Sequence, residues 1–458
     1  MRTFFVLVLL LVLGAGGAWY YAGKRPGPVI EIVQPTKGVG QSGEAIVDVL
    51  VPAEKLQRLE MSLEQGDRKT VLFDLSTPTT SAQLAHLPDR VRVTRPIGKH
   101  ELPDLQEGKA RLIVSATRPV LFGFRSVSST ASKDFEVHLI PPQISVLSQF
   151  HFINQGGSEM VVYRTSEGAQ SGVRVGQYEY PGFPASGAGI ANATPDMRVA
   201  FFALLWNQDT SSPISIFSRD DYGNESHASF DYRVIPKSFR KSRIPIDDRF
   251  LAKVVPAILQ NTPNFNVPNP SDLVDSFLHI NRELRQQNGA TIAEMSKHTA
   301  PQILWQGAFK QLANTAVEAG FADQRTYVYQ GKEIDQQVHL GFDLASYANT
   351  PVHAANRGRV VHAAYLGIYG NCVILDHGMG LQSLYAHLSS IEVKVGEEVQ
   401  SGQELGRSGS TGMAGGDHLH FTMLLNGNAI TPIDWWSAQW VNDRITRKLR
   451  EAGGGTTK

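Results

Sequence analysis

The sequence predicts a mainly β protein with several domains, and three observations lead to this fold class. The chain has 458 residues, more than a single hydrophobic core usually organises. Short runs rich in β-branched and aromatic residues recur between residues 26 and 236 and again after residue 320. Helical periodicity is concentrated between these regions. We therefore expect two N-terminal immunoglobulin-like β-sandwiches, a helical connector and a C-terminal domain rich in strands.

The N-terminal segment has the length and composition of a membrane-spanning helix. Residues 4–22 carry no charge and would span about 28 Å as a helix, close to the thickness of a bilayer core. Trp19, Tyr20 and Tyr21 suit a membrane interface and favour a retained anchor. The small residues at 16–18 would suit the cleavage site of a signal peptide. We expect residues 1–25 to be a membrane anchor or signal peptide, and the remaining chain to be exported in either case.

Two sets of strand-like runs follow, with turn-forming clusters between them. Runs at 29–33, 45–51, 59–63, 110–115 and 135–139 predict a first sandwich over residues 26–140. Runs at 160–163, 198–205, 214–217 and 229–234 predict a second over residues 141–236. The histidines of both regions show no ligand spacing, so we expect them to be structural.

The pattern changes at about residue 237. Lys237, Arg240, Lys241 and Arg243 predict a solvated basic linker. Helical spacing follows at 247–259 and again after Ser271, which could cap a helix that Gly289 would end. We expect a helical connector over 237–300. Strand-like runs at 359–364, 372–376 and 381–387 then place a further domain at 301–438, with a C-terminal helix and tail at 439–458.

Composition excludes some classes of function. The 43 basic residues balance the 43 acidic ones, which argues against nucleic acid as a partner. Cys372 is the single cysteine, so neither a disulfide framework nor a multi-cysteine zinc site can form. Cys372 lies in a strand-like run, and we expect a packed thiol.

Histidines with ligand chemistry gather in the last third of the chain. His418 and His420 flank Leu419 at the end of a Gly-rich loop, and on a strand they would point to the same face. Upstream, His339 and Asp343 would lie about 13 Å apart on a straight strand, but Gly341 allows the backbone to bend between them. These two residues and one histidine of the later pair would suit a catalytic zinc site, which uses three protein ligands and one open position.

The segments HLGFD, SLYAHLS and GRSGSTGMAGGDHLHF, in this order over roughly residues 320–435, resemble the motifs of the lysostaphin-type zinc metalloendopeptidases. The resemblance implies a C-terminal antiparallel β-sheet peptidase domain. It implies that His339, Asp343 and His420 bind zinc and that His387 and His418 are catalytic. Thr422 departs from the Glu that relatives often carry, but this position is not a ligand in the family pattern.

The same resemblance implies a function. We expect an exported zinc metalloendopeptidase that hydrolyses the peptide cross-links of bacterial peptidoglycan, with the two catalytic histidines acting on a zinc-activated water. We expect it in the cell envelope on the periplasmic side, attached to the inner membrane by residues 4–22. The sandwiches could bind protein partners. The alternative is a non-catalytic activator of a cell-wall amidase, or a scaffold, with the same fold.

Overall fold

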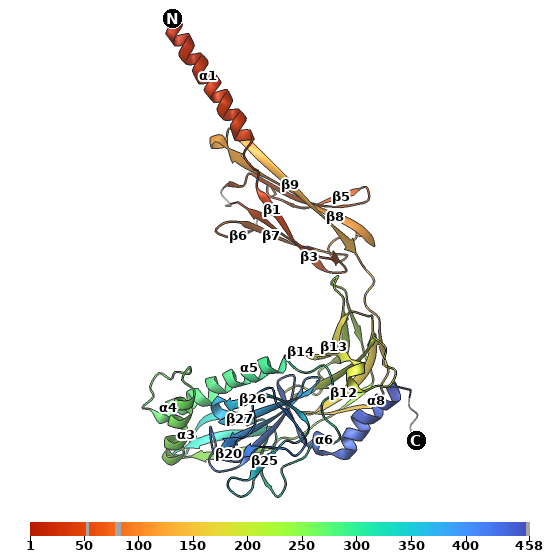
Figure 1. Cartoon of the computed structure of the whole chain (residues 1–458), viewed down its shortest axis with the longest axis vertical. Coiled ribbons are helices and arrows are strands. Elements are labelled where there is room, and N and C mark those ends of the chain that lie inside the picture. The colour runs from red at the N-terminus through yellow and green to blue at the C-terminus, as the bar shows by residue number, and fades with distance from the viewer. Residues whose placement is uncertain (52–54, 78–83, 455–458) are drawn as a thin grey trace. The chain divides into compact units, whose positions relative to one another are not determined.

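The computed structural model describes residues 1–51, 55–77 and 84–454. The chain forms two compact units, of which one comprises Met1–Pro142 and Arg219–Ser226 and the other comprises Gln143–Ser218 and His227–Lys458. Strands dominate both units, which confirms the predicted mainly β class (Figure 1). Residues 455–458 of the expected tail lie outside the described residues.

The first unit begins with a long apolar helix and continues as two packed sheets. Helix α1 spans Arg2–Gly23, and it is the one helix in the described part of the chain that is long and apolar enough to cross a membrane. One sheet has the order β1 (Val29–Gln34), β3 (Gly43–Leu50), β7 (Val91–Ile97), β6 (Leu84–His86). The other has the order β2 (Gly38–Val39), β9 (Arg125–Val137), β8 (Gly108–Val120), β4 (Arg58–Gln65), β5 (Arg68–Asp74). Val47, Phe73 and Leu112 are fully buried in the core that the two sheets share.

Another pair of sheets follows along the chain, most of it in the second unit. Their orders are β10 (Ile144–Val146), β12 (Ser158–Thr165), β16 (Met197–Ala203), β15 (Phe183–Pro184) and β14 (Tyr178–Pro181), β13 (Gln170–Val175), β17 (Ile214–Arg219), β18 (Glu225–Ala228). Strands β11 (His151–Asn154) and β19 (Tyr232–Ile235) form a separate parallel pair. The two-sheet organisation agrees with the expected sandwich, and the immunoglobulin-like assignment remains a prediction for both regions.

The predicted basic linker is a linker at residues 237–240, but its second half, with Lys241 and Arg243, is part of a sheet. Strand β20 (Lys241–Ile246) pairs in parallel with β22 (Asp323–Tyr329), which pairs with β23 (Lys332–His339). The charges misled the sequence interpretation because exposed positions alternate along an edge strand with the apolar Ile244 and Ile246.

The helices of the connector region differ from the prediction at their ends. Helix α3 (Asp248–Asn261) begins after Asp247, whose carboxylate accepts a hydrogen bond from the Phe250 N–H. Helix α4 (Leu273–His279) is capped by Asp272 rather than by Ser271. It continues through a π-helical turn (Ile280–Leu284) into α5 (Arg285–Ser296), so Gly289 does not end the helix. Packing of Leu284 and Ile292 outweighs the roughly 1 kcal/mol helical cost of one glycine.

The C-terminal domain is built on an antiparallel sheet, as expected. Its order is β21 (Ala316–Ala319), β24 (Phe342–Ala345), β32 (Leu419–Leu425), β28 (Leu381–Leu388), β27 (Asn371–Gly378), β26 (Gly358–Tyr365), β30 (Glu398–Val399), and β33 (Asn428–Ile430) pairs with β32. A smaller sheet contains β25 (Pro351–His353), β31 (Glu404–Arg407) and β29 (Ser390–Ile391). Ile292 of α5 packs on one face of the large sheet with Cys372, which is buried as predicted.

The opposite face of this sheet shares one hydrophobic core with the preceding sandwich. Tyr163 and Phe201 of the sandwich belong to the same buried cluster as Tyr385 and Trp435. The chain ends in short helices, namely α6 (Ile433–Trp436), α7 (Ala438–Val441), a π-helical turn (Asn442–Thr446) and α8 (Arg447–Ala452). The Trp435 Nε1–H donates to Ser158 Oγ at 3.1 Å. The second sandwich and the C-terminal domain are therefore parts of one folded body.

Candidate metal centre

Strand register brings the three sequence motifs to one end of the large sheet. Asp343 on β24 pairs directly with His420 on β32, and Ala386 on β28 pairs with His420 from the other side. His387 is therefore the next residue along β28, and His339 is the last residue of β23. The backbone turns at Leu340 and Gly341, which lie between β23 and β24, so that His339 and Asp343 meet as the sequence suggested.

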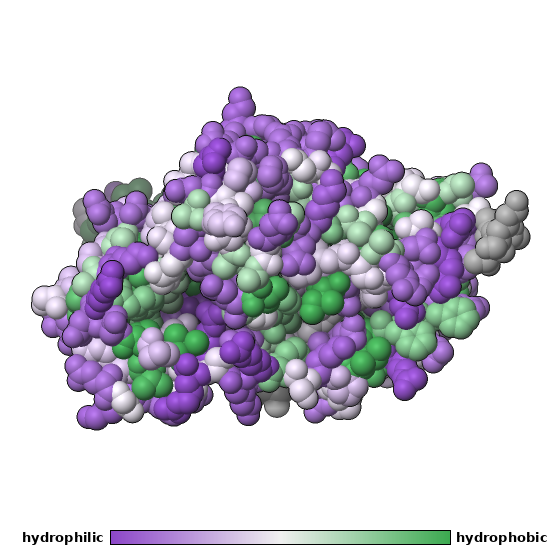
Figure 2. All heavy atoms as spheres, turned by 90° about the horizontal axis from the view of Figure 1, so that it is seen from below, coloured by the Kyte–Doolittle hydropathy of each residue, from purple (hydrophilic) through white to green (hydrophobic). Residues whose placement is uncertain are grey.

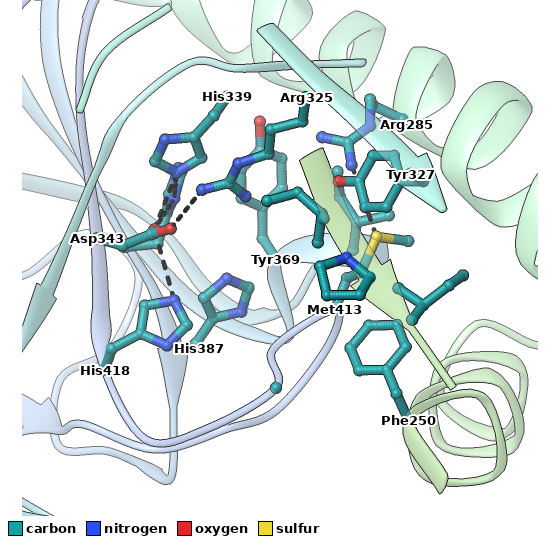
Figure 3. A pocket seen from close by; sticks show the side chains of 16 residues that line it. Phe250, Arg285, Arg325, Tyr327, His339, Asp343, Tyr369, His387, Met413 and His418 are labelled. Carbon is teal, nitrogen blue, oxygen red and sulfur yellow. Dashed lines mark hydrogen bonds and ion pairs between the residues drawn. The ribbon is translucent and has the colours of Figure 1, made fainter. Parts of the chain in front are cut away.

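Buried side-chain atoms of His339, Asp343 and His420 form a compact cluster, and Figure 3 shows His339 and Asp343 facing each other. His339 Nε2 lies 2.9 Å from Asp343 Oδ1, and His420 Nδ1 lies 3.0 Å from the same oxygen. The two ring nitrogens are 3.0 Å apart. These three donors lie within 4.8 Å of one another, a spacing that a single ion could bridge.

The other ring nitrogen of each clustered histidine is held by a neighbouring oxygen. His339 Nδ1–H donates to the Gly320 carbonyl at 3.0 Å. His420 Nε2–H donates to Thr422 Oγ1 at 3.0 Å, and the Thr422 hydroxyl donates to the Leu340 carbonyl at 3.0 Å. These contacts place the protons on the outer nitrogens, so that lone pairs of the inner nitrogens face Asp343. Converging lone pairs repel one another unless a cation lies between them, so the donor set fits a metal ion.

Gly341 permits this close approach of backbone and ligand. A Cβ atom at position 341 would lie 2.5 Å from Thr422 Oγ1 and 2.7 Å from His420 Nε2. The glycine is thus required by the space that His420 and Thr422 occupy. The sequence interpretation assigned Gly341 a bend, and the contact with Thr422 is an additional reason for its presence.

His387 and His418, for which the family resemblance predicts catalytic roles, lie beside the cluster (Figure 3). His418 Nε2 is 3.4 Å from Asp343 Oδ1, and its Nδ1–H donates to the Gly416 carbonyl at 3.0 Å. His387 Nδ1–H donates to the Thr411 carbonyl at 2.8 Å. The His387 and His418 ring centroids are 4.9 Å apart. Both residues therefore present Nε2 to the same space, with their outer nitrogens fixed by the Gly-rich loop.

The backbone of His387 is in the left-handed region, with φ of 63°. A non-glycine residue in this conformation costs of order 1–3 kcal/mol, and such residues concentrate at functional sites. The register of β27 against β28 is irregular between Asn371 and Val373, opposite His387. This bulge turns the imidazole out of the regular alternation of the strand and towards the cluster.

The charge state of the site follows from burial and from the histidines around Asp343. Burial alone would raise the pKa of Asp343, but the surrounding imidazoles of His339, His418 and His420 favour its ionised form and hold that pKa well below its usual range. Burial, and then the neighbouring His418 and His420, lower the pKa of His387 well below that of a free imidazole. Burial opposes protonation of His418, but the Asp343 carboxylate outweighs it and raises the His418 pKa. The pKa values of His387 and His418 are thus shifted in opposite directions.

Arg325 and Thr422 belong to the site and were not identified from the sequence. Arg325 on β22 donates from Nη2 to Asp343 Oδ2 at 2.9 Å, which leaves Oδ1 for the cluster. Thr422 lies two residues after His420 on the same strand. Side chains two residues apart on a strand point to the same face, so the sequence pattern could have identified Thr422. No comparable sequence pattern pointed to Arg325, which reaches Asp343 from another sheet.

The cluster lines a cavity of about 270 Å³. Its other walls come from the region predicted to be a connector, through Ile244 and Ile246 of β20, Phe250 of α3 and Arg285 at the start of α5. Lys253 of α3 also donates to the Gly415 carbonyl of the Gly-rich loop at 3.1 Å. The connector region therefore forms part of the site.

Comparisons with known proteins match the region that contains the cluster. The model of peptidase family M23 matches residues 337–432. The chain is 38% identical over 97 residues to the DD-carboxypeptidase/endopeptidase Mpg of Neisseria meningitidis, covering 21% of this chain and 22% of the relative. It is 39% identical over 92 residues to the peptidoglycan DD-endopeptidase ShyA of Vibrio cholerae, covering 20% and 21%. These matches span about a fifth of each relative.

A solved structure is also similar to part of this chain. The catalytic domain of lysostaphin from Staphylococcus simulans shares 30% sequence identity with it. The match covers 29% of this chain and 98% of that structure, with a TM-score of 0.24.

Proposed function

Residues 337–432 form a peptidase M23 domain of the lysostaphin type, and on this basis we propose that the protein is an exported zinc endopeptidase that hydrolyses the peptide cross-links of peptidoglycan. The observation that carries the proposal is the convergence of His339, Asp343 and His420 with inward-facing lone pairs beside two further oriented histidines. Such a donor set suits zinc, which binds imidazole nitrogen and carboxylate oxygen and leaves one position for water or substrate.

His339, Asp343 and His420 would hold the metal, each through the atom that faces the cluster. Bound zinc would supply Lewis-acid polarisation of the scissile carbonyl and a water of lowered pKa. The Arg325 guanidinium neutralises Asp343 Oδ2 and fixes the carboxylate plane, so that Oδ1 remains directed into the site. Thr422 orients His420 in the same way, because its hydroxyl accepts the His420 Nε2–H.

His387 and His418 would move protons during hydrolysis. Their Nδ1–H groups are held by the Thr411 and Gly416 carbonyls, so both direct Nε2 towards the cavity, where His418 Nε2 also lies 3.4 Å from Asp343 Oδ1. The lowered pKa of His387 suits a neutral imidazole that accepts a proton from the attacking water. His418, with Nδ1–H fixed by the Gly416 carbonyl, would donate to the leaving amine or stabilise the oxyanion. This division of roles is part of the proposal, and in it His418 would be the acid.

The proposed substrate rests on the relatives and on the composition of the surface. Two relatives that match about a fifth of this chain are named as endopeptidases of the DD type, one of them a peptidoglycan DD-endopeptidase. Figure 2 shows a molecular face on which hydrophilic residues predominate and hydrophobic ones form small separate groups, a surface compatible with a polar polymer. Helix α1 would retain the enzyme at the inner membrane, facing the cell wall.

The test uses the full chain in detergent, loaded with zinc and incubated with purified peptidoglycan sacculi. We expect mass spectrometry to detect newly freed amines on the cross-linking diamino acid. His420→Ala should lose most bound zinc, whereas His387→Ala and His418→Ala should retain zinc and lose turnover. His353→Ala is the matched control, because His353 is an exposed histidine on β25 of the same domain.

Different failures would have different meanings. Full zinc occupancy in His420→Ala would refute the ligand assignment. Cleavage between sugar and peptide would identify an amidase instead. If the zinc-loaded wild-type protein released nothing, the alternative of a non-catalytic amidase activator would be favoured.

A further inference from the structure

A second cavity adjoins the metal centre and has a strongly basic lining. It has a volume of about 730 Å³ and lies where β20, β22 and β23 meet the loop at Trp206. Arg285 and Arg325 line both this cavity and the cavity of the metal centre. A ligand extended across these two arginines would therefore pass from the second cavity to the reacting groups.

The lining carries three positive charges that no acidic lining residue offsets. Lys241, Arg285 and Arg325 are the charged residues that border the second cavity among those the structure describes. The remaining lining residues are amides, hydroxyls and apolar side chains such as Gln324, Thr326 and Gln337. Arg325 is engaged with Asp343, which leaves the charges of Lys241 and Arg285 for a ligand. This excess of positive charge favours an anion.

Arg285 is held in a defined orientation. Its Nε–H donates to the Asn281 carbonyl at 3.1 Å, and Nη2 donates to Asn281 Oδ1 at 2.6 Å. Nη2 also contacts Met413 Sδ at 3.6 Å (Figure 3). No protein acceptor within the described ranges contacts Nη1. A guanidinium fixed on one edge loses little entropy when it binds an anion through the other edge.

We propose that this basic cavity is a substrate subsite that binds a free carboxylate of the peptide strand beside the scissile bond, through Lys241 and Arg285. The inference rests on the proposed function, because it specifies which peptides the same site prefers. Strands of cross-linked wall peptides carry carboxylates that an enzyme can meet either free or amidated. The subsite would distinguish these two forms.

The experiment compares two synthetic cross-linked peptides that differ only by a free or an amidated carboxyl group on one strand. The full zinc-loaded chain should cleave the acid with a kcat/KM about tenfold above that of the amide, since one charge-assisted hydrogen bond is worth about this factor. Lys241→Met and Arg285→Gln should reduce this preference mainly by raising KM for the acid. Lys241→Met, which lies outside the cavity of the metal centre, should leave the kcat for the amide unchanged.

Lys332→Met provides the control, because Lys332 is an exposed lysine on β23 outside both cavities. It should keep the wild-type preference. Equal cleavage of acid and amide by the wild-type chain would overturn the subsite and leave the peptidase proposal intact. Cleavage of neither peptide, with zinc bound, would overturn the proposed function itself. Because Lys241 is exposed on an edge strand, Lys241→Met tests the idea even if Arg285→Gln misfolds.

An independent observation concerns the first unit, where the turn between β8 and β9 exposes aromatic side chains. Phe122 is 100% exposed and Phe124 is 76% exposed, at the tip of a hairpin whose strands each run for 13 residues. The backbone of Leu121, Phe122 and Gly123 is left-handed throughout, with φ of 52°, 57° and 91°. Exposing two aromatic rings within three residues is unfavourable in water and marks an interaction surface.

The C-terminal end of helix α1 lies against this hairpin (Figure 1). Ala22 packs with Val120 and Val127, and the Arg125 guanidinium contacts the Trp19 carbonyl and lies 5.3 Å from the Trp19 ring centroid. The exposed phenylalanines therefore lie close to the end of the apolar helix where Trp19, Tyr20 and Tyr21 occur. Aromatic residues near the end of a membrane-spanning helix favour the membrane interface.

We infer that the β8–β9 tip inserts Phe122 and Phe124 into the lipid interface beside α1, which gives the first unit a second attachment to the bilayer. The test labels Phe122→Cys with an environment-sensitive fluorophore in the full chain, reconstituted in phosphatidylcholine and phosphatidylglycerol vesicles. The native Cys372 is buried and should not react. The control is Asp67→Cys on the exposed β4–β5 turn.

The probe at position 122 should show blue-shifted emission and be quenched by lipid-borne quenchers, whereas the probe at position 67 should behave as in water. Water-like emission at both positions would overturn the inference. Removal of residues 1–25 during maturation, detected by N-terminal sequencing, would also overturn it, because the tip would then lack the adjacent helix.

Discussion

Replacing Thr422 with Val should weaken zinc binding without unfolding the protein. The hydroxyl of Thr422 accepts the His420 Nε2–H and donates to the Leu340 carbonyl, each at 3.0 Å. Valine has nearly the same shape and can do neither. The buried Nε2–H of His420 would then have no acceptor, at a cost of about 1–3 kcal/mol. The alternative is to move the proton to Nδ1, and this would remove the lone pair that faces the metal.

The expected loss of zinc affinity is about 10–100-fold, the range found when a group that orients a metal-binding histidine is removed. Competition with a chromophoric chelator at pH 7.5 measures this loss. Burial lowers the pKa of His420 to about 4, so the imidazole is neutral at this pH and only its tautomer is at issue. Thr422→Ser keeps the hydroxyl and should stay within a few-fold of wild type. Thermal unfolding of both zinc-free variants checks that the fold is retained.

Equal zinc affinities for the Val and Ser variants would refute this reasoning, because they would show that the hydroxyl has no part in orienting His420. A Thr422→Val protein that binds zinc normally but has lost turnover would place the effect on the reaction instead of on the ligand.

Three further predictions concern burial and close packing. Gly341→Ala should lose zinc while the sheet stays folded, because its Cβ would approach Thr422 Oγ1 to 2.5 Å, and metal analysis with circular dichroism checks both. Lys448→Met should lower the free energy of unfolding by about 3–5 kcal/mol by leaving buried Glu159 unpaired, and adding Glu159→Gln should recover at least half in denaturant titrations. Asp434→Asn should stabilise by up to about 3 kcal/mol at pH 7.5 and have little effect at pH 4.

The sign of the Asp434 effect follows from its burial, which raises the pKa of this carboxyl from 3.8 to about 6. Between these values the folded protein binds more protons than the unfolded chain, so stability falls as pH rises through this range. The ionised carboxylate therefore destabilises the fold fully above pH 6, and the penalty disappears as pH falls towards 4. A larger stabilisation by Asn at pH 4 than at pH 7.5 would contradict this assignment.

Two polar contacts join the C-terminal segment to the second sandwich, and they limit which fragments of the protein can fold. Lys448 Nζ donates to Glu159 Oε1 at 2.8 Å, and both side chains are almost completely buried. Trp435, on the same C-terminal segment, reaches Ser158 of the sandwich. A fragment that starts at residue 300 would expose this apolar surface and would also lack β20, the parallel partner of β22. The peptidase region should therefore be assayed together with the second sandwich.

Local sequence patterns were sufficient to predict the fold class and most of the residues that meet in the candidate site. The alternation of a strand places His418, His420 and Thr422 on one face, and a bend at Gly341 is enough to bring His339 to Asp343. The predicted ligand set forms one cluster, although its metal-binding role remains a prediction that only the zinc measurements can test. Turn residues and apolar runs also indicated most of the strands, since these depend on neighbours in the sequence.

Features that depend on distant contacts could not be predicted in this way. The charges at 237–243 suggested a linker because sequence alone does not show that Ile244 and Ile246 have a partner strand about 80 residues later. Gly289 suggested a helix end because its local cost is visible and the packing of Leu284 and Ile292 is not. Domain boundaries at 236 and 438 follow composition, whereas the buried cluster crosses both positions.

The sequence by itself determined the chemistry of this protein, namely an apolar N-terminal segment, β-rich regions and three spaced motifs with five residues suited to a metal centre. Only the tertiary structure decided what surrounds that chemistry. Arg325 and Arg285 reach the metal centre, and Lys241 reaches the adjoining cavity, from other elements of the chain. Their positions follow from strand pairing and helix packing. The physical reason is that residue type and local spacing are properties of short segments, whereas electrostatic environment depends on which distant segments fold against one another.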